Sequence, residues 1–81
     1  MWFRWSMDLK ETMAINLRRI RHERHMTQEE LADLAGVSAR YIGAIERADK
    51  SATVTVLGKI SAALDIDPGE LLRNREKMKS E

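Results

Sequence analysis

Two closely spaced helix starts near the middle of the chain constrain its fold more than any other feature. Thr27 is a suitable N-cap, and Glu30, three residues later, completes a capping box. Gly36 follows, where a residue with positive φ ends a helix at little cost. Ser38 then caps a second helix, which we expect to end near Arg47. Two short helices joined by a glycine-containing turn make a helix-turn-helix candidate.

Leu31, Leu34 and Ala35 are expected to form the apolar face of the first helix of this pair. Apolar residues also recur at helical spacing on both sides of the pair. Before it, Leu9, Met13, Leu17 and Ile20 repeat at intervals of 4, 4 and 3, which predicts a helix from about Asp8 to Arg24. After it, a second stripe predicts a fourth helix; its members are Val54, Leu57, Ile60 and Leu64.

A fifth helix is predicted from capping residues. Asp67 is a suitable N-cap and Pro68 suits the first helical position. The sequence has one proline, four glycines and no Asn-Gly or Asp-Gly hairpin signal. We therefore expect an all-α fold, a compact five-helix domain over residues 8–75. An aromatic extension (1–7) precedes it, and a charged tail (76–81) follows.

Length and charge narrow the function classes. With 81 residues the chain holds one small domain, and its net charge of +1 excludes a histone-like or tail-like binder. The absence of cysteine excludes disulfides and cysteine zinc sites. We see no signal peptide and no membrane span, so we expect a cytoplasmic protein with no membrane partner.

At this point the central segment resembles the Cro/cI-type helix-turn-helix of lambda-repressor-like regulators. The resemblance rests on Thr27-Gln28-Glu29-Glu30-Leu31-Ala32, Ala35-Gly36-Val37-Ser38, Tyr41-Ile42 and Ile45-Glu46-Arg47, and extends over about Met13 to Leu72. It implies a transcriptional regulator that binds operator DNA as a homodimer, without a cofactor or small-molecule ligand. Ala48 and Ala52 depart from the family, which often has Gly and Pro near those places.

The resemblance also implies which residues contact DNA. The implied contacts, in the motif of about residues 27–47 and just after it, are Gln28, Ser38, Ala39, Arg40, Tyr41, Ala44, Arg47 and Lys50. From the helical arrangement, Ile42 and Ile45 face the core, which leaves Ala39, Arg40, Gly43 and Ala44 to face outward. Arg40 is the candidate for base recognition, because a guanidinium can bond guanine O6 and N7 together.

Each implied contact has a structural alternative. Arg40 and Lys50 are otherwise solvated cations, and Gln28 and Ser38 are otherwise residues of helix ends. The Tyr41 ring is otherwise packed on the core with its hydroxyl in water. For the whole domain, the alternative function is a protein-interaction module or antitoxin that neutralises a partner protein.

Three further features are open from sequence alone. The basic stretch Arg18–His25 is interpreted mainly as a solvated helix face, and its two histidines lack a third metal ligand. We expect no enzyme, because no phosphate loop or nucleophile arrangement occurs. The dimer surface is placed either on the last two helices (Ile66, Leu71, Leu72, Met78) or on Met1–Trp5. The aromatics of Met1–Trp5 otherwise cover the domain's own core, or precede a true start at Met7 or Met13.

Overall fold

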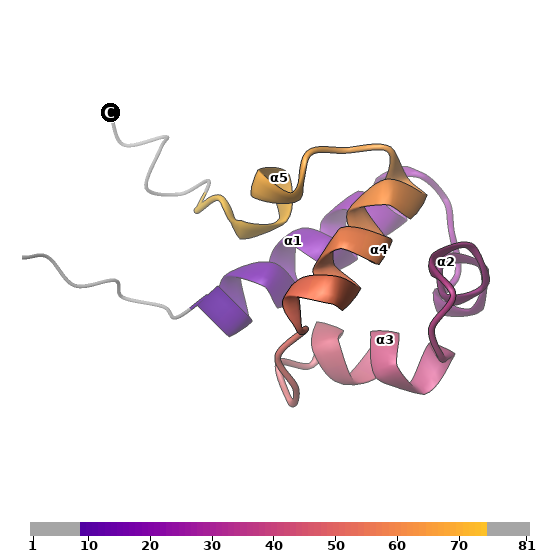
Figure 1. Cartoon of the computed structure of the whole chain (residues 1–81), viewed down its shortest axis with the longest axis horizontal. Coiled ribbons are helices and arrows are strands. Elements are labelled where there is room, and N and C mark those ends of the chain that lie inside the picture. Colours follow the sequence, from indigo (N-terminus) through magenta and orange to yellow (C-terminus); the bar gives the residue numbers. More distant parts are fainter. Residues whose placement is uncertain (1–8, 75–81) are drawn as a thin grey trace, which may run out of the picture.

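The computed structural model describes residues 9–74, and five helices account for most of them (Figure 1). The helices are α1 (Leu9–Glu23), α2 (Gln28–Ala35), α3 (Ala39–Glu46), α4 (Val54–Leu64) and α5 (Pro68–Leu72). The predicted all-α, five-helix architecture is confirmed. The predicted extension over 1–7 and tail over 76–81 lie outside the described residues.

The predicted caps define the helix-turn-helix. Thr27 Oγ1 accepts from the Glu30 amide at 3.0 Å, and the Glu30 carboxylate accepts from the Thr27 amide at 2.8 Å. Gly36 ends α2 at φ 75°, and Ser38 Oγ accepts from the amide of Tyr41 at 3.0 Å. In Figure 1, α2 is seen nearly end-on while α3 lies along the lower edge, so the two helices cross steeply. Local hydrogen bonds thus define the helix ends on both sides of the turn.

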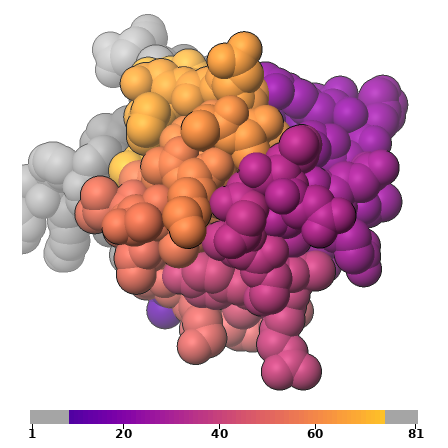
Figure 2. Space-filling model, turned by 45° about the vertical axis from the view of Figure 1, so that its right-hand side comes forward, coloured from indigo at the N-terminus to yellow at the C-terminus, as the bar shows by residue number. Residues whose placement is uncertain are grey.

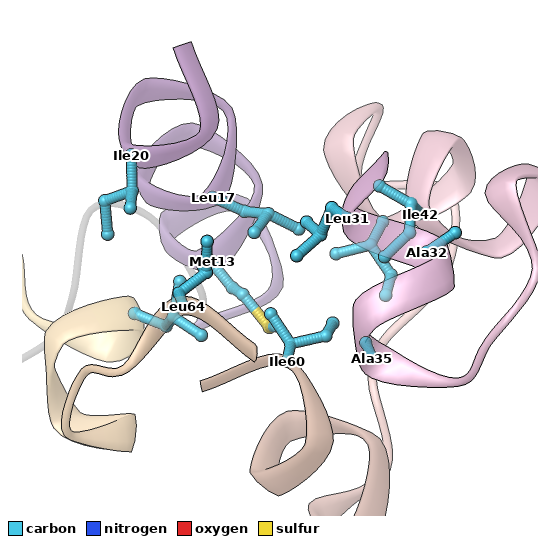
Figure 3. Packing of buried hydrophobic residues seen from close by; sticks show 11 residues of the cluster. Met13, Leu17, Ile20, Leu31, Ala32, Ala35, Ile42, Ile60 and Leu64 are labelled. Carbon is cyan, nitrogen blue, oxygen red and sulfur yellow. The ribbon is translucent and has the colours of Figure 1, made fainter. Parts of the chain in front are cut away.

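One apolar core holds the five helices together. The α1 helix packs on α3 and α5, α2 packs on α3 and α4, and α4 packs on α5. Side chains from four helices converge on a common centre in Figure 3, among them Leu17, Leu31, Ile42 and Ile60, all fully buried. No helix within residues 9–74 has both the length and the apolarity to cross a bilayer.

Three residues predicted for apolar faces are exposed instead. Leu9 is 55% exposed, Leu34 is 64% exposed and Val54 is 86% exposed. Leu9 and Val54 are the first residues of α1 and α4, so their stripes run past the end of the core. Helical period predicts which side of a helix is apolar, but it does not predict how far along the helix its neighbours extend.

The loop after α3 contains a residue in an unfavourable conformation. Ala48 has φ 61°, in the left-handed region, where a Cβ costs about 1–2 kcal/mol. We expect Ala48→Gly to raise the free energy of unfolding by about 0.5–1 kcal/mol, since the greater freedom of glycine in the unfolded chain offsets part of the gain. Chemical denaturation monitored by circular dichroism measures it.

A matched variant tests the sign of this effect. Ala62 is exposed in α4, where glycine should lower stability by about 0.5–1 kcal/mol. If both alanine-to-glycine changes destabilise the protein, the strain argument at Ala48 is wrong.

Candidate nucleic-acid interface

The start of α3 carries three of the residues predicted to contact DNA. Arg40 and Ser38 are exposed, and Ala39 is half-buried against the core. Among the described residues, no hydrogen bond or ion pair occupies the Arg40 guanidinium. Side chains of α3 and the following loop project from the lower edge of the molecule in Figure 2, in pink and salmon. A charged side chain with no intramolecular partner is available to a ligand.

The outward orientation predicted for Gly43 and Ala44 is wrong. Ala44 is only 6% exposed, and Gly43 is also buried. The α3 helix packs on α1 as well as on α2, so burial extends well beyond Ile42 and Ile45. The resemblance implies a DNA contact at Ala44, but at 6% exposure its methyl group offers little surface for one.

The surface of α3 at Gly43 is covered by two of the predicted contact residues. A Cβ placed on Gly43 would lie 3.3 Å from Nη1 of Arg47 and 3.4 Å from Oε1 of Gln28. The structure thus brings Gln28 from α2 and Arg47 from the end of α3 together. Glycine at position 43 leaves the space in which these two side chains approach the helix.

Gln28 is held from the other side by a buried carboxylate. Its Nε2 donates to Oε1 of Glu46 at 3.0 Å. The same carboxylate accepts two hydrogen bonds from Arg21, from Nε at 2.6 Å and from Nη2 at 2.9 Å. Arg21 also donates to the carbonyl of Met26 at 2.8 Å, in the α1–α2 connection. One carboxylate on α3 therefore joins α1 and α2.

The basic stretch is consequently only partly a solvated face. Arg21 is buried, and Arg18 donates to the carbonyl of Glu46 at 3.1 Å. Arg24 donates to the carbonyl of Leu64, at the end of α4. The interpretation of Arg18–His25 as a solvated surface is wrong for Arg21, since a buried guanidinium needs a partner and finds it in Glu46.

The ion pair shifts the titration of both partners. Burial by itself raises the pKa of the Glu46 carboxyl, but the hydrogen bonds from Arg21 and Gln28, with the charges of Arg21 and Arg18, outweigh it. The pKa of Glu46 consequently lies below its ordinary 4.5. The hydrogen bond with Glu46 raises the pKa of Arg21, so both groups are charged at neutral pH.

Acid should weaken the fold through Glu46. Because its folded-state pKa is lowered, its contribution to the free energy of unfolding is complete above pH 4.5 and is lost as the pH falls through the folded-state pKa. We expect the melting temperature to fall more steeply below pH 4.5 in the wild type than in Glu46→Gln. Thermal melts across this range measure both slopes, and equal slopes would remove Glu46 as the source.

The remaining predicted contacts flank the α3–α4 loop. Tyr41 is half-buried against the core, and its hydroxyl donates to the carbonyl of Ser51 at 3.4 Å. Arg47 pairs with Asp49 across 3.0 Å, with both side chains exposed, and Lys50 is exposed. The Tyr41 ring thus packs against the core, as its structural alternative has it, but its hydroxyl bonds to the loop that carries Lys50.

Of the residues predicted for a dimer surface on the last two helices, those that the structure describes pack within the monomer. Leu71 is fully buried and closes the monomer core. Ile66 and Leu72 are half-buried against that core, and Met78 lies outside the described residues. The α5 helix therefore has a structural function within one chain.

Sequence reasoning missed Arg21 and Glu46, although a signal for both was present. Arg21 follows Leu17 by four residues, and Glu46 follows Ile42 by four residues. Each charge thus continues an apolar stripe, and opposite charges at such positions indicate a buried pair.

Three comparisons place the chain among known proteins. It matches the helix-turn-helix family HTH_3 over residues 17–71. It is 36% identical over 75 residues to control protein C.SmaI from Serratia marcescens, across 93% of this chain and 88% of that protein. The structure resembles restriction-modification controller protein C.AhdI from Aeromonas hydrophila, with a TM-score of 0.74, 34% identity, and 76% and 94% of the two chains covered.

A similar structure comes from a protein–DNA complex. The P22 c2 repressor, crystallised with a synthetic operator, matches with a TM-score of 0.71 and 30% identity, over 75% of this chain and 92% of that one. The family match covers every helix that carries the candidate interface. The chain therefore belongs to the HTH_3 family of helix-turn-helix proteins, the cI-like group that its central motif predicts.

Proposed function

We propose that this protein is a sequence-specific DNA-binding transcriptional regulator that acts as a homodimer on operator DNA. The observation that carries the proposal is Arg40 on the first turn of α3, which is exposed and has no partner among residues 9–74. It lies in a helix-turn-helix whose helix ends are capped at Thr27, Gly36 and Ser38. In helix-turn-helix proteins the first turns of the second helix contact base edges in the major groove.

The surrounding residues support backbone contacts. Gln28 and Arg47 flank α3 at Gly43, and Lys50 lies in the loop that follows. Ser38 and Tyr41, with the small Ala39, complete the proposed surface on either side of Arg40. These residues fix the position of α3 on the duplex, and Arg40 supplies base discrimination.

Arg40→Ala should weaken binding to the preferred sequence by about 1–3 kcal/mol, with the loss concentrated at one base position in each half-site. The reason is that a bidentate guanidinium–guanine pair is lost. The preferred duplex is first selected from a random library. Binding titrations against this duplex and against its single-position substitutions then measure the loss at each base position. Lys50→Ala is the comparison, because loss of a phosphate contact weakens all sequences alike. A uniform loss in Arg40→Ala would make Arg40 a phosphate contact.

A homodimer follows from how little one copy can read. The exposed part of α3 reaches only a few base pairs, and specificity in this class comes from two half-sites about 34 Å apart. Occupancy of the operator then regulates transcription by blocking or recruiting polymerase. Such a regulator acts in the compartment that holds the DNA, so the proposal includes a cytoplasmic location.

Salt-dependent binding tests the proposal as a whole. Binding to a random duplex should weaken with a log–log slope of about −0.9 per phosphate contacted. Lys50→Gln should reduce the size of that slope, whereas Lys59→Gln, an exposed lysine on α4, should leave it unchanged. Failure of both random and selected DNA to bind at low salt would reject the DNA-binding function. Binding by single copies only, shown by sedimentation of the complex, would reject the homodimer.

A further inference from the structure

An apolar groove lies between the starts of α1 and α4 and the end of α5. Its volume is about 220 Å³, and its apolar lining includes Leu9, Met13, Val54, Leu57 and Leu72. Leu9 and Val54 are the two most exposed apolar residues of α1 and α4. The apolar stripes of α1 and α4 thus extend, at Leu9 and Val54, beyond the part that the other described residues cover.

The size and chemistry of the groove favour an aromatic side chain as its occupant. Pockets that bind small molecules are usually about 300–1,000 Å³, larger than this one. Lys10 lies on the rim, and among the described residues no hydrogen bond or ion pair engages its ammonium group. An apolar groove beside a free ammonium suits an indole, because tryptophan is the strongest cation–π acceptor.

The sequence supplies such side chains a few residues before Leu9. Trp2, Phe3 and Trp5 precede Leu9, which itself lines the groove. Trp5 is four residues from Leu9, so at no more than roughly 3.6 Å per residue its Cα lies within about 14 Å of that of Leu9. A segment tethered this closely has an effective concentration of about millimolar or more at the groove.

We propose that the aromatic segment Trp2–Trp5 docks into the α1/α4/α5 groove of its own chain. The indole of one tryptophan covers Leu9 and Val54, beside the Lys10 ammonium. The groove is also lined by Lys50 and Ser51 of the α3–α4 loop, so the docked segment contacts the loop that Tyr41 holds. The inference stands without the proposed DNA-binding function, because it rests on the groove and the segment alone.

Tryptophan fluorescence of the full chain tests the docking directly. The sequence has two tryptophans, both in the segment, so all tryptophan emission reports on it. We expect emission shifted to shorter wavelength and acrylamide quenching several-fold weaker than for free N-acetyl-tryptophanamide. Val54→Asp should reverse both effects. Val54 is 86% exposed at the first position of α4, where an acidic residue is favourable, so this variant should fold.

A matched control separates docking from a general effect of added charge. Ile15 is 54% exposed on α1 and does not line the groove, so Ile15→Asp should leave emission and quenching as in the wild type. Circular dichroism confirms that both variants are helical. Emission like that of free tryptophan in the wild type, or equal emission in the wild type and Val54→Asp, would overturn the proposal.

A dilution series distinguishes docking in the same chain from exchange between two chains, and a triple variant tests docking by its effect on stability. The blue shift should be unchanged over a dilution series that spans any self-association seen by sedimentation. A shift that disappears together with self-association would overturn the same-chain assignment. The full-length triple variant Trp2→Ser, Phe3→Ser, Trp5→Ser should melt about 4–8 °C lower. An unchanged melting temperature would contradict docking.

Discussion

Replacing Glu46 with alanine should lower the free energy of unfolding by about 3–5 kcal/mol, the cost typical of leaving one charge of a buried pair without its partner. Arg21 is buried and directs Nε and Nη2 at this carboxylate, at 2.6 and 2.9 Å. Gln28 loses its partner at the same time. Urea denaturation of the wild type and the variant measures the difference.

A double variant tests whether the uncompensated charge causes this loss. Arg21→Met combined with Glu46→Leu replaces the pair by apolar groups, and such replacements are often neutral or stabilising. We expect the double variant to be more stable than Glu46→Ala. If it is as unstable as the single variant, the loss reflects missing volume at position 46. DNA binding by the double variant should still be weaker, because Gln28 is no longer held beside α3.

Replacing Asn16 with alanine should lower the free energy of unfolding by about 2–4 kcal/mol, because two carbonyls at the end of α5 lose their hydrogen-bond donor. Asn16 is buried in α1, and its Nδ2 donates to the carbonyls of Leu71 and Arg73, both at 2.9 Å. A helix of five residues is not stable alone, so α5 depends on such contacts with α1. Denaturation measures the loss, and hydrogen exchange should show it first in the amides of α5.

A neighbouring side chain provides the control for Asn16. Arg19 lies on the same helix, forms an ion pair with Glu23 at 3.4 Å near the surface and donates to Oδ1 of Asn16 at 3.5 Å. Arg19→Ala therefore keeps both hydrogen bonds from Asn16 Nδ2 to the end of α5. Surface ion pairs contribute at most about 1 kcal/mol, so Arg19→Ala should have a small effect. Equal losses in both variants would indicate weakening of α1 itself and would exclude a specific role of Asn16 in holding α5.

Sequence reasoning predicted the helices well because their ends are determined locally. Thr27, Ser38 and Asp67 each accept a backbone amide within three residues, as their N-cap assignment requires. The end of α2 is also determined locally, because Gly36 adopts a left-handed conformation and its amide donates to the carbonyl of Ala32. Signals of this kind are complete within one turn of chain, so they do not depend on how the helices pack.

The features that were missed depend on contacts between helices. Ala44 is buried in a helix that packs on both α1 and α2, and the helical period of α3 does not predict either contact. The partnership of Arg21 and Glu46 joins residues 25 positions apart. Of the candidate interface, the exposure of Arg40, Ser38 and Lys50 was predictable, whereas the internal contacts of Gln28 and Tyr41 were not.

The residues that hold α3 in the fold are different from the residue proposed to contact a base, and this affects how such proteins diverge. Its inner residues, Ile42, Ile45 and Glu46, are buried and hold the helix in place, whereas Arg40 has no partner in the described part of the chain. If Arg40 contacts a base as proposed, a substitution at position 40 would therefore change the preferred base with little effect on the free energy of unfolding. Proteins with this domain could then acquire new target sites one residue at a time, without a compensating change elsewhere in the fold.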